Sequence, residues 1–157
     1  MLSLPICPFD TTPDEVVRGM LEIAEVKPDD IVFDLGSGDG RIAITAAKEF
    51  GAIAYGVEIR KDLVKAARDK VRKLKLNFRV RIIYGDLFRA DISRADAVFL
   101  YLTEGINIML RPKLERELKL GARIVSHDYP IRGWVPKKIK TIGGHILYLY
   151  IKEKVIL

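Results

Sequence analysis

The stretch that decides the fold is VFDLGSGDGR, from Val32 to Arg41. A short apolar and β-branched run ends in an acid, and glycines then follow at every second position. This pattern predicts a buried strand that turns tightly into a helix, with the turn backbone open to a ligand. The glycines have neither the Gly-x-Gly-x-x-Gly spacing of a dinucleotide site nor the lysine-containing signature of a nucleoside triphosphatase. The loop therefore predicts a nucleotide-like ligand that has no pyrophosphate.

The segments around this loop alternate between strand-like and helix-like patterns. Strands are expected at residues 31–35, 52–58, 78–86, 95–102 and 121–128, and helices at 10–26, 41–50, 60–76 and 104–118. Thr12 is expected to cap the first helix. Gly143 and Gly144 separate two further strand-like runs, which is typical of a hairpin. The chain is therefore expected to be an α/β protein with a seven-stranded, mostly parallel sheet, an antiparallel C-terminal hairpin strand and helices on both faces.

Length and composition exclude several classes of protein. A chain of 157 residues fits one domain, which we place at residues 1–157. Its single cysteine, Cys7, cannot form an internal disulfide and is expected to be inert. The N-terminus lacks the pattern of a secretory signal, and no apolar run approaches the roughly 20 residues that cross a bilayer. We expect a cytoplasmic monomer that makes no contact with membranes.

Charge is abundant and unevenly distributed. Charged residues make up 31% of the chain, glutamine is absent, and asparagine occurs only as Asn77 and Asn107, which suggests a thermophilic source. Residues 60–81, which we call the basic segment, contain ten lysines or arginines against two acids, Asp62 and Asp69. The basic segment could hold RNA or DNA phosphates, attract acidic protein surfaces, or form a solvated helix face in an ion-pair-rich protein.

Candidate ligand-binding residues follow the predicted strands, because ligands of open α/β sheets lie beyond the carboxyl ends of the strands. Glu58 comes eighteen residues after Gly40, where an acid can accept hydrogen bonds from ribose hydroxyls. Asp86 could accept from the exocyclic amine of adenine, with Ile59 and Leu87 on the two faces of the ring. Together these residues indicate an adenosine site.

The motifs FDLGSGDG, GVE and GDLF, in this order, resemble the seven-strand (class I) S-adenosylmethionine-dependent methyltransferases over most of the chain. The resemblance implies a Rossmann-like fold with S-adenosyl-L-methionine as cofactor. It places the glycine loop under the amino-acid end of the cofactor, Glu58 on the ribose and Asp86 by adenine. The loop residues that it assigns to the cofactor are Asp34, Gly36, Ser37, Gly38 and Gly40.

A narrower resemblance rests on PFDTTPDEVV, DLGSGDGRI, YLT and RIVSHDYPI, between roughly residues 5 and 135. These motifs are similar to the small archaeal protein-lysine methyltransferases and their mitochondrial relatives. The resemblance implies transfer to the ε-amine of lysines exposed on proteins, with a broad range of targets. Residues 1–27 would cover the cofactor, with Phe9 and Thr12 at its methionine end. Four residues would form the catalytic lysine channel: Tyr101, Thr103, His127 and Tyr129.

Each of these assignments has a structural alternative. Tyr101 could cap its strand, Thr103 could cap the following helix, and His127 could be a structural histidine. Phe88 and Trp134 could be substrate platforms or edge packing. At the level of function, the alternatives are a nucleic-acid methyltransferase that uses the basic segment and a non-enzymatic adenosine-binding module. YLTEG stands where methyltransferases of adenine or glutamine carry Asn or Asp, two prolines and an aromatic residue, which argues against planar acceptors. No metal ligand is assigned from the sequence.

Overall fold

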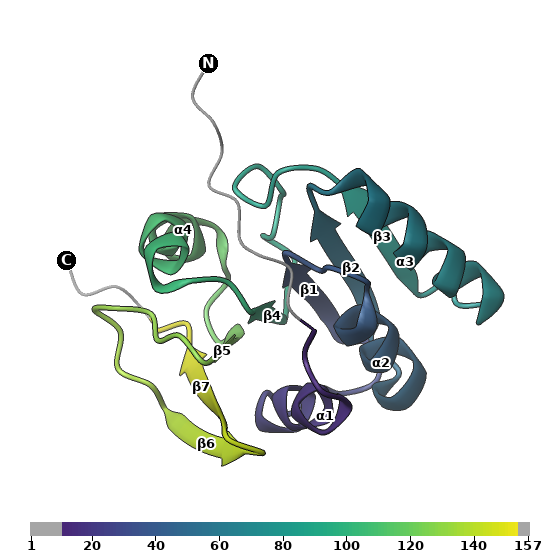
Figure 1. Ribbon diagram of the computed structural model, residues 1–157. Helices are drawn as coiled ribbons and strands as arrows, with labels where there is room; N and C mark the ends of the chain where they lie inside the picture. The colour runs from purple at the N-terminus through teal and green to yellow at the C-terminus, as the bar shows by residue number, and fades with distance from the viewer. Residues whose placement is uncertain (1–10, 154–157) are drawn as a thin grey trace.

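The computed structural model describes residues 11–153, in which seven strands form a single sheet (Figure 1). The strand order is β3-β2-β1-β4-β5-β7-β6. The first five strands of this order are parallel, and β7 runs antiparallel to both β5 and β6. The strands are β1 Ile31–Leu35, β2 Ile53–Glu58, β3 Val80–Tyr84, β4 Ala97–Leu100, β5 Arg123–His127, β6 Lys138–Ile142 and β7 His145–Ile151. The predicted mostly parallel sheet with an antiparallel C-terminal hairpin strand is confirmed.

Helices cover both faces of the sheet, as the sequence predicts. The helices are α1 Asp14–Ile23, α2 Arg41–Phe50, α3 Lys61–Lys73 and α4 Glu104–Glu117. One apolar core joins α1, α2 and α3 to one face, and a second core joins α4 to the other face (Figure 1). Neighbouring residues of β1 alternate between the two cores, Val32 in the first and Phe33 in the second, because successive strand side chains point to opposite faces.

The predicted N-cap of the first helix is wrong by one residue. Pro13, and not Thr12, occupies the N-cap of α1, because its ψ of 148° is extended and its carbonyl accepts the N–H groups of Val16 and Val17. Thr12 makes no side-chain cap, and its carbonyl accepts a hydrogen bond from Arg41 instead. No helix within residues 11–153 has the length and apolar character needed to cross a membrane.

The register of the parallel strands brings their carboxyl ends to one edge of the sheet. Leu35 of β1 is level with Leu100 of β4, which is level with Ser126 of β5. On the other side, Glu58 of β2 is level with Tyr84 of β3. The segments that follow these five strands therefore lie along one edge, where the candidate site is built.

Candidate active site

The glycine loop after β1 folds over the end of β2. The backbone N–H groups of Gly36 and Ser37 both donate to the carbonyl of Val57, at 2.8 and 3.0 Å. The next N–H, from Gly38, donates to the Glu58 Oε1 at 2.9 Å. The loop and the acid that the sequence assigns to one adenosine ligand are therefore bonded directly to each other.

Glycine is required in this loop by both backbone conformation and space. Gly36 and Gly40 each have a φ of +84°, in the left-handed region that side chains disfavour. A Cβ on Gly36 would lie 2.9 Å from Leu102, and one on Gly40 would lie 3.1 Å from Ala67. The first close approach brings the segment after β4 against the glycine loop, and the second packs the start of α2 against α3.

Asp34, at the end of β1, is a buried carboxyl group with a strongly raised pKa. Its exposed fraction is 3%, and Glu58 beside it is buried as well. Burial, followed by the charges of Glu58 and Asp39, raises the pKa of Asp34 to about 8. Among residues 11–153 the charges that act on Asp34 are negative, so a ligand that carries positive charge would favour its ionised form.

Arg41 is a residue of the site that the sequence reasoning missed. It donates to both carboxylate oxygens of Asp39, at 3.1 and 2.7 Å, and to the carbonyl of Thr12 at 2.8 Å. Although burial opposes ionisation of Asp39, the hydrogen bonds from Arg41 and the charge of Lys70 hold its pKa below the ordinary value. Arg41 therefore fastens buried Thr12 beside the glycine loop. Phe9 and Cys7 lie outside the described residues.

Glu58 and Asp86 follow neighbouring strands. The second carboxylate oxygen of Glu58 accepts the N–H of Arg60 at 2.8 Å, and its carbonyl accepts the N–H of Gly85 at 2.9 Å. Asp86 accepts the N–H of Phe88 at 2.9 Å. The bond from Gly85 to Glu58 joins the ends of β2 and β3. The two predicted apolar neighbours of adenine remain accessible, Ile59 at 42% exposure and Leu87 half-buried.

The four residues predicted for the acceptor side lie at or just after the carboxyl ends of the adjacent strands β4 and β5. The rings of Tyr101 and His127 are stacked, with centroids 3.8 Å apart. Tyr129 is 39% exposed. Thr103 caps α4, because its side chain accepts the N–H of Ile106 at 3.2 Å. The structural role expected for Thr103 is therefore present, whatever further role it has.

Asn107 of α4 supports this region and was not predicted. It is fully buried, and its amide nitrogen donates to the Ser126 hydroxyl at 3.3 Å and to the carbonyl of Tyr129 at 3.2 Å. Asn107 thus ties α4 to the turn after β5. Its position in the sequence carried a signal, since it lies on the same face as the core residues Leu110 and Leu114.

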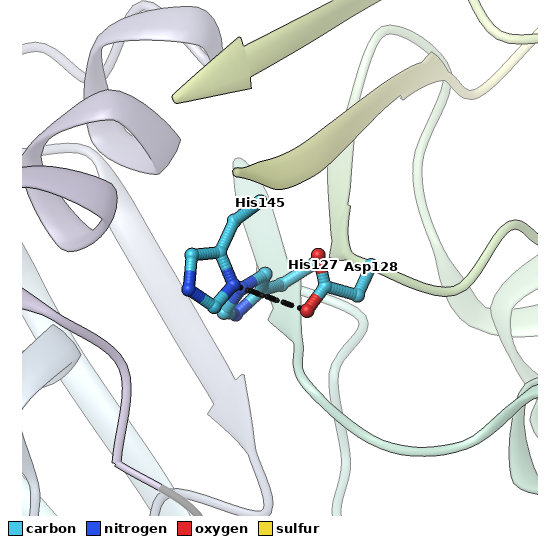
Figure 2. A group of neighbouring side chains, drawn as sticks. All are labelled: His127, Asp128 and His145. Atoms are coloured by element: carbon cyan, nitrogen blue, oxygen red, sulfur yellow. Dashed lines mark hydrogen bonds and ion pairs between the residues drawn. The ribbon is translucent and has the colours of Figure 1, made fainter. Parts of the chain in front are cut away.

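His145 is a further residue that the sequence reasoning missed. It begins β7 and faces His127 and Asp128 at the end of β5 (Figure 2). The Nδ1 of His145 lies 2.8 Å from the Nε2 of His127 and 3.1 Å from the Oδ2 of Asp128. Burial opposes ionisation of Asp128, but hydrogen bonds from Ile146 and His145 and the neighbouring imidazole charges hold its pKa below the ordinary value.

Trp134 and Phe88, for which the sequence left two interpretations open, are both packed against the core that contains α4. Trp134 donates its indole N–H to Glu115 at 2.9 Å and meets the ring of Tyr150 edge to face, with centroids 5.8 Å apart. Phe88 is half-buried and packs on the same core as α4. Edge packing accounts for both positions.

With this geometry in place, comparison with known proteins shows the family. The ANTKMT methyltransferase domain matches residues 34–138, from the acid of β1 to the first residue of β6. The chain belongs to this methyltransferase family. The match begins at the glycine loop and includes every described site residue discussed above except Thr12 and His145.

Three relatives illustrate the range of this methyltransferase family. A protein-lysine N-methyltransferase of Saccharolobus islandicus (strain REY15A) is 49% identical, over 96% of this chain and 97% of the relative. The adenine nucleotide translocase lysine N-methyltransferase of Mus musculus is 31% identical over 85% of this chain, which spans only 58% of that relative. The crystal structure of an RNA methyltransferase from Salinibacter ruber, in complex with S-adenosyl-L-homocysteine, is 43% identical with a TM-score of 0.91, covering 94% and 97% of the two chains.

The raised pKa of Asp34 predicts a specific dependence of stability on pH. Between about pH 4 and pH 8 the folded protein keeps a proton on Asp34 that the unfolded chain has released. The free energy of unfolding therefore falls as pH rises through this window, by at most about 1.4 kcal/mol per pH unit. Asp34→Asn cannot titrate, so its stability relative to wild type should increase from pH 5 to pH 8. Urea denaturation across this range measures the difference.

The matched control for this prediction is Asp62→Asn, which removes an exposed carboxylate on α3. Its stability should follow that of the wild type at every pH. Parallel pH profiles for Asp34→Asn and wild type would contradict the raised pKa.

Proposed function

We propose that this chain is an S-adenosyl-L-methionine-dependent methyltransferase that methylates the ε-amine of lysine residues in proteins. The observation that carries the proposal is the match, over nearly the whole of both chains, to the Saccharolobus islandicus protein-lysine N-methyltransferase. The more distant relative from Mus musculus is also named as a lysine methyltransferase. The acceptor side, with its tyrosines and no Asn-Pro-Pro-aromatic segment, agrees with an amine on a flexible chain.

The residues of the glycine loop fit the cofactor. S-adenosyl-L-methionine supplies a methyl group already activated on a cationic sulfonium, so the protein has mainly to align the reactants and exclude water. Glu58 offers negative charge to a cationic ligand, and Asp34, which keeps its proton near neutral pH, would release it when such a ligand binds. The hydroxyl of Ser37 is buried against Gly56 of β2 and has no hydrogen-bond partner among residues 11–153. Each Glu58 oxygen accepts one backbone N–H and retains a lone pair for ribose hydroxyls.

The acceptor side must deliver a neutral amine. With an ordinary pKa of about 10.4, roughly one lysine in a thousand is neutral between pH 7 and 7.5. Desolvation between aromatic rings lowers that pKa, so a strong general base is not obligatory. We assign Tyr101 and Tyr129 to the walls of the lysine channel. His127 would support the ring of Tyr101, and Thr103 would border the channel at the start of α4.

Replacement of Glu58 tests the cofactor site. Glu58→Gln keeps the size of the side chain but removes its charge and one acceptor oxygen. Loss of a charged hydrogen bond of about 1.5–3 kcal/mol should weaken binding of S-adenosyl-L-homocysteine by about 10- to 150-fold. Calorimetry measures the affinity, with Glu49→Gln on the exposed face of α2 as the control. Equal affinities for the two variants would remove Glu58 from the cofactor site.

Tyr101→Phe tests the acceptor side. The ring can still stack on His127, while the hydroxyl is lost. If the hydroxyl contacts the lysine in the transition state, kcat should fall about tenfold, the effect of one hydrogen bond, with cofactor affinity unchanged. The control is Tyr84→Phe at the exposed end of β3. A transfer rate equal to that of Tyr84→Phe would leave the ring, but not the hydroxyl, in the proposed role.

An RNA methyltransferase is the second candidate, because the Salinibacter ruber relative carries that name. The basic segment borders a groove of about 530 Å³ between α3 and β3, whose lining includes Arg68, Arg72 and Arg81. Two of these cations are already engaged, Arg68 with the carbonyl of Ile82 and Arg72 with Asp69. The groove also lies at the β3 edge, whereas Tyr101 and His127 lie at the carboxyl ends of β4 and β5 in the middle of the sheet. These observations favour the lysine acceptor.

Transfer from isotopically labelled cofactor to a cell extract separates the two functions. We expect label that survives nuclease, is lost to protease and is recovered as methyl-lysine after hydrolysis. The charge reversals Lys65→Glu and Arg81→Glu should leave this transfer unchanged. Label that nuclease removes, and that the charge reversals reduce at least about tenfold through lost phosphate contacts, would establish the RNA function instead.

The remaining features of the proposal concern the whole protein. We place a single methyltransferase domain at residues 1–157, with residues 1–27 covering the cofactor. The single cysteine and the scarcity of amide side chains support a cytoplasmic, thermophilic, archaeal-type enzyme. We further expect a monomer that binds its protein substrates transiently.

A further inference from the structure

Three potential metal ligands converge where β5 ends and β7 begins, outside the residues assigned to the cofactor. Figure 2 shows the imidazoles of His127 and His145 side by side, with the carboxylate of Asp128 turned toward them. The Nε2 of His127 lies 2.8 Å from the Nδ1 of His145 and 3.4 Å from the Oδ2 of Asp128. The third distance, from His145 Nδ1 to Asp128 Oδ2, is 3.1 Å. We propose that these three side chains bind a divalent transition-metal ion, with Zn²⁺ as the best match.

The distances between the ligand atoms agree with coordination. Zinc bonds to nitrogen and oxygen of about 2.0–2.2 Å place adjacent ligand atoms about 2.8–3.6 Å apart, from octahedral to tetrahedral geometry. All three measured distances lie in this range. Two imidazoles and one carboxylate are also a donor set that zinc takes in sites with an open fourth position.

Hydrogen bonding alone does not satisfy this arrangement. The Nδ1 of His145 is within hydrogen-bond distance of both His127 Nε2 and Asp128 Oδ2. A ring nitrogen has a single in-plane direction, which carries either one N–H or one lone pair. A proton on this nitrogen can therefore serve one of the two partners well, whereas a cation between the three atoms contacts all of them at once.

The surrounding structure holds the ligands in place. Asp128 donates its N–H to the carbonyl of Ile146 at 2.7 Å, and its Oδ1 accepts the N–H of Ile146 at 2.9 Å. These bonds leave Oδ2 directed at the histidines, as in metal sites whose carboxylates are oriented by outer hydrogen bonds. The φ of Asp128 is +65°, a left-handed conformation that costs about 1 kcal/mol or more in a non-glycine residue. His127 is fully buried and fixed by its stacking on Tyr101.

An ion at this position would tie the β6–β7 hairpin to the end of β5. The side chains of Asp128 and His145 are each 29% exposed, so an ion can enter from solvent. The bound ion would hold the His127 ring against Tyr101. The bound ion would therefore have a structural role beside the proposed acceptor region. Its binding does not depend on the identity of the methyl acceptor.

Metal titration of protein prepared without a histidine tag and treated with chelator tests the proposal. We expect one Zn²⁺ per chain by calorimetry, a melting temperature that rises with added Zn²⁺, and visible absorption bands with Co²⁺. His127 and His145 are the only histidines in the chain, so Co²⁺ bands of a nitrogen-ligated site would arise from them. His145→Gln and Asp128→Asn should each weaken binding at least about tenfold, while Asp62→Asn should bind as the wild type does.

Two results would overturn the proposal. Absence of saturable Zn²⁺ and Co²⁺ binding by the wild type would mean that a shared proton occupies the cluster. Equal affinity of Asp128→Asn and Asp62→Asn would place the ion elsewhere. Circular dichroism confirms folding of each variant, and the nearly isosteric Asp128→Asn decides the question if His145→Gln does not fold. None of these readouts requires methyl transfer.

Discussion

The hydrogen bond from the Gly38 N–H to the Glu58 carboxylate is the contact on which the candidate site depends. Together with the paired bonds from Gly36 and Ser37 to Val57, it folds the loop after β1 over the end of β2. The positive φ angles of the glycines make this approach possible. Once the loop is in place, α2 begins directly after it. These three hydrogen bonds therefore position both Glu58 at the end of β2 and the start of α2.

The same folding imposes an electrostatic cost. It buries Asp34 next to Glu58, and burial with the neighbouring charges raises the pKa of Asp34 to about 8. Asp39 shows how the cost is avoided elsewhere in the loop, because Arg41 and Lys70 compensate its charge. An uncompensated buried acid is a poor contribution to stability, and such groups concentrate where a ligand supplies the missing charge. The proposed cationic cofactor supplies it here.

The C-terminal hairpin adds a residue to the proposed acceptor side of the site. Because β7 inserts antiparallel between β5 and β6, its first residue, His145, returns to the carboxyl edge of the parallel strands. That edge already holds His127 and Tyr101. Asn107 adds a connection from α4 on the opposite face of the sheet. Two elements distant in sequence thus fix the turn that contains Asp128 and Tyr129.

Most of the fold, and the position of the glycine loop and Glu58 at one edge of the sheet, were predictable, because their signals are local. The run that ends at Asp34, the spacing of the glycines and the acid eighteen residues after Gly40 lie within single strand-turn-helix units. The alternation of periods 2 and 3.6 then implies a parallel sheet, whose geometry brings these units to one edge. The predicted N-cap of α1 was wrong because proline constrains only φ, so that ψ can be extended, as it is at Pro13.

The sequence by itself determined the fold class and the family, and it singled out the glycine loop that we propose for the cofactor. Only the tertiary structure decided the contacts of Arg41 with Thr12, of Asn107 with the turn after β5, and of His145 with His127 and Asp128. The physical reason is that periodicity reports which face of an element is buried. It does not report which side chains meet across the faces of the sheet or at the end of a hairpin. Those meetings follow from strand order and register, which are set by the packing of the whole domain.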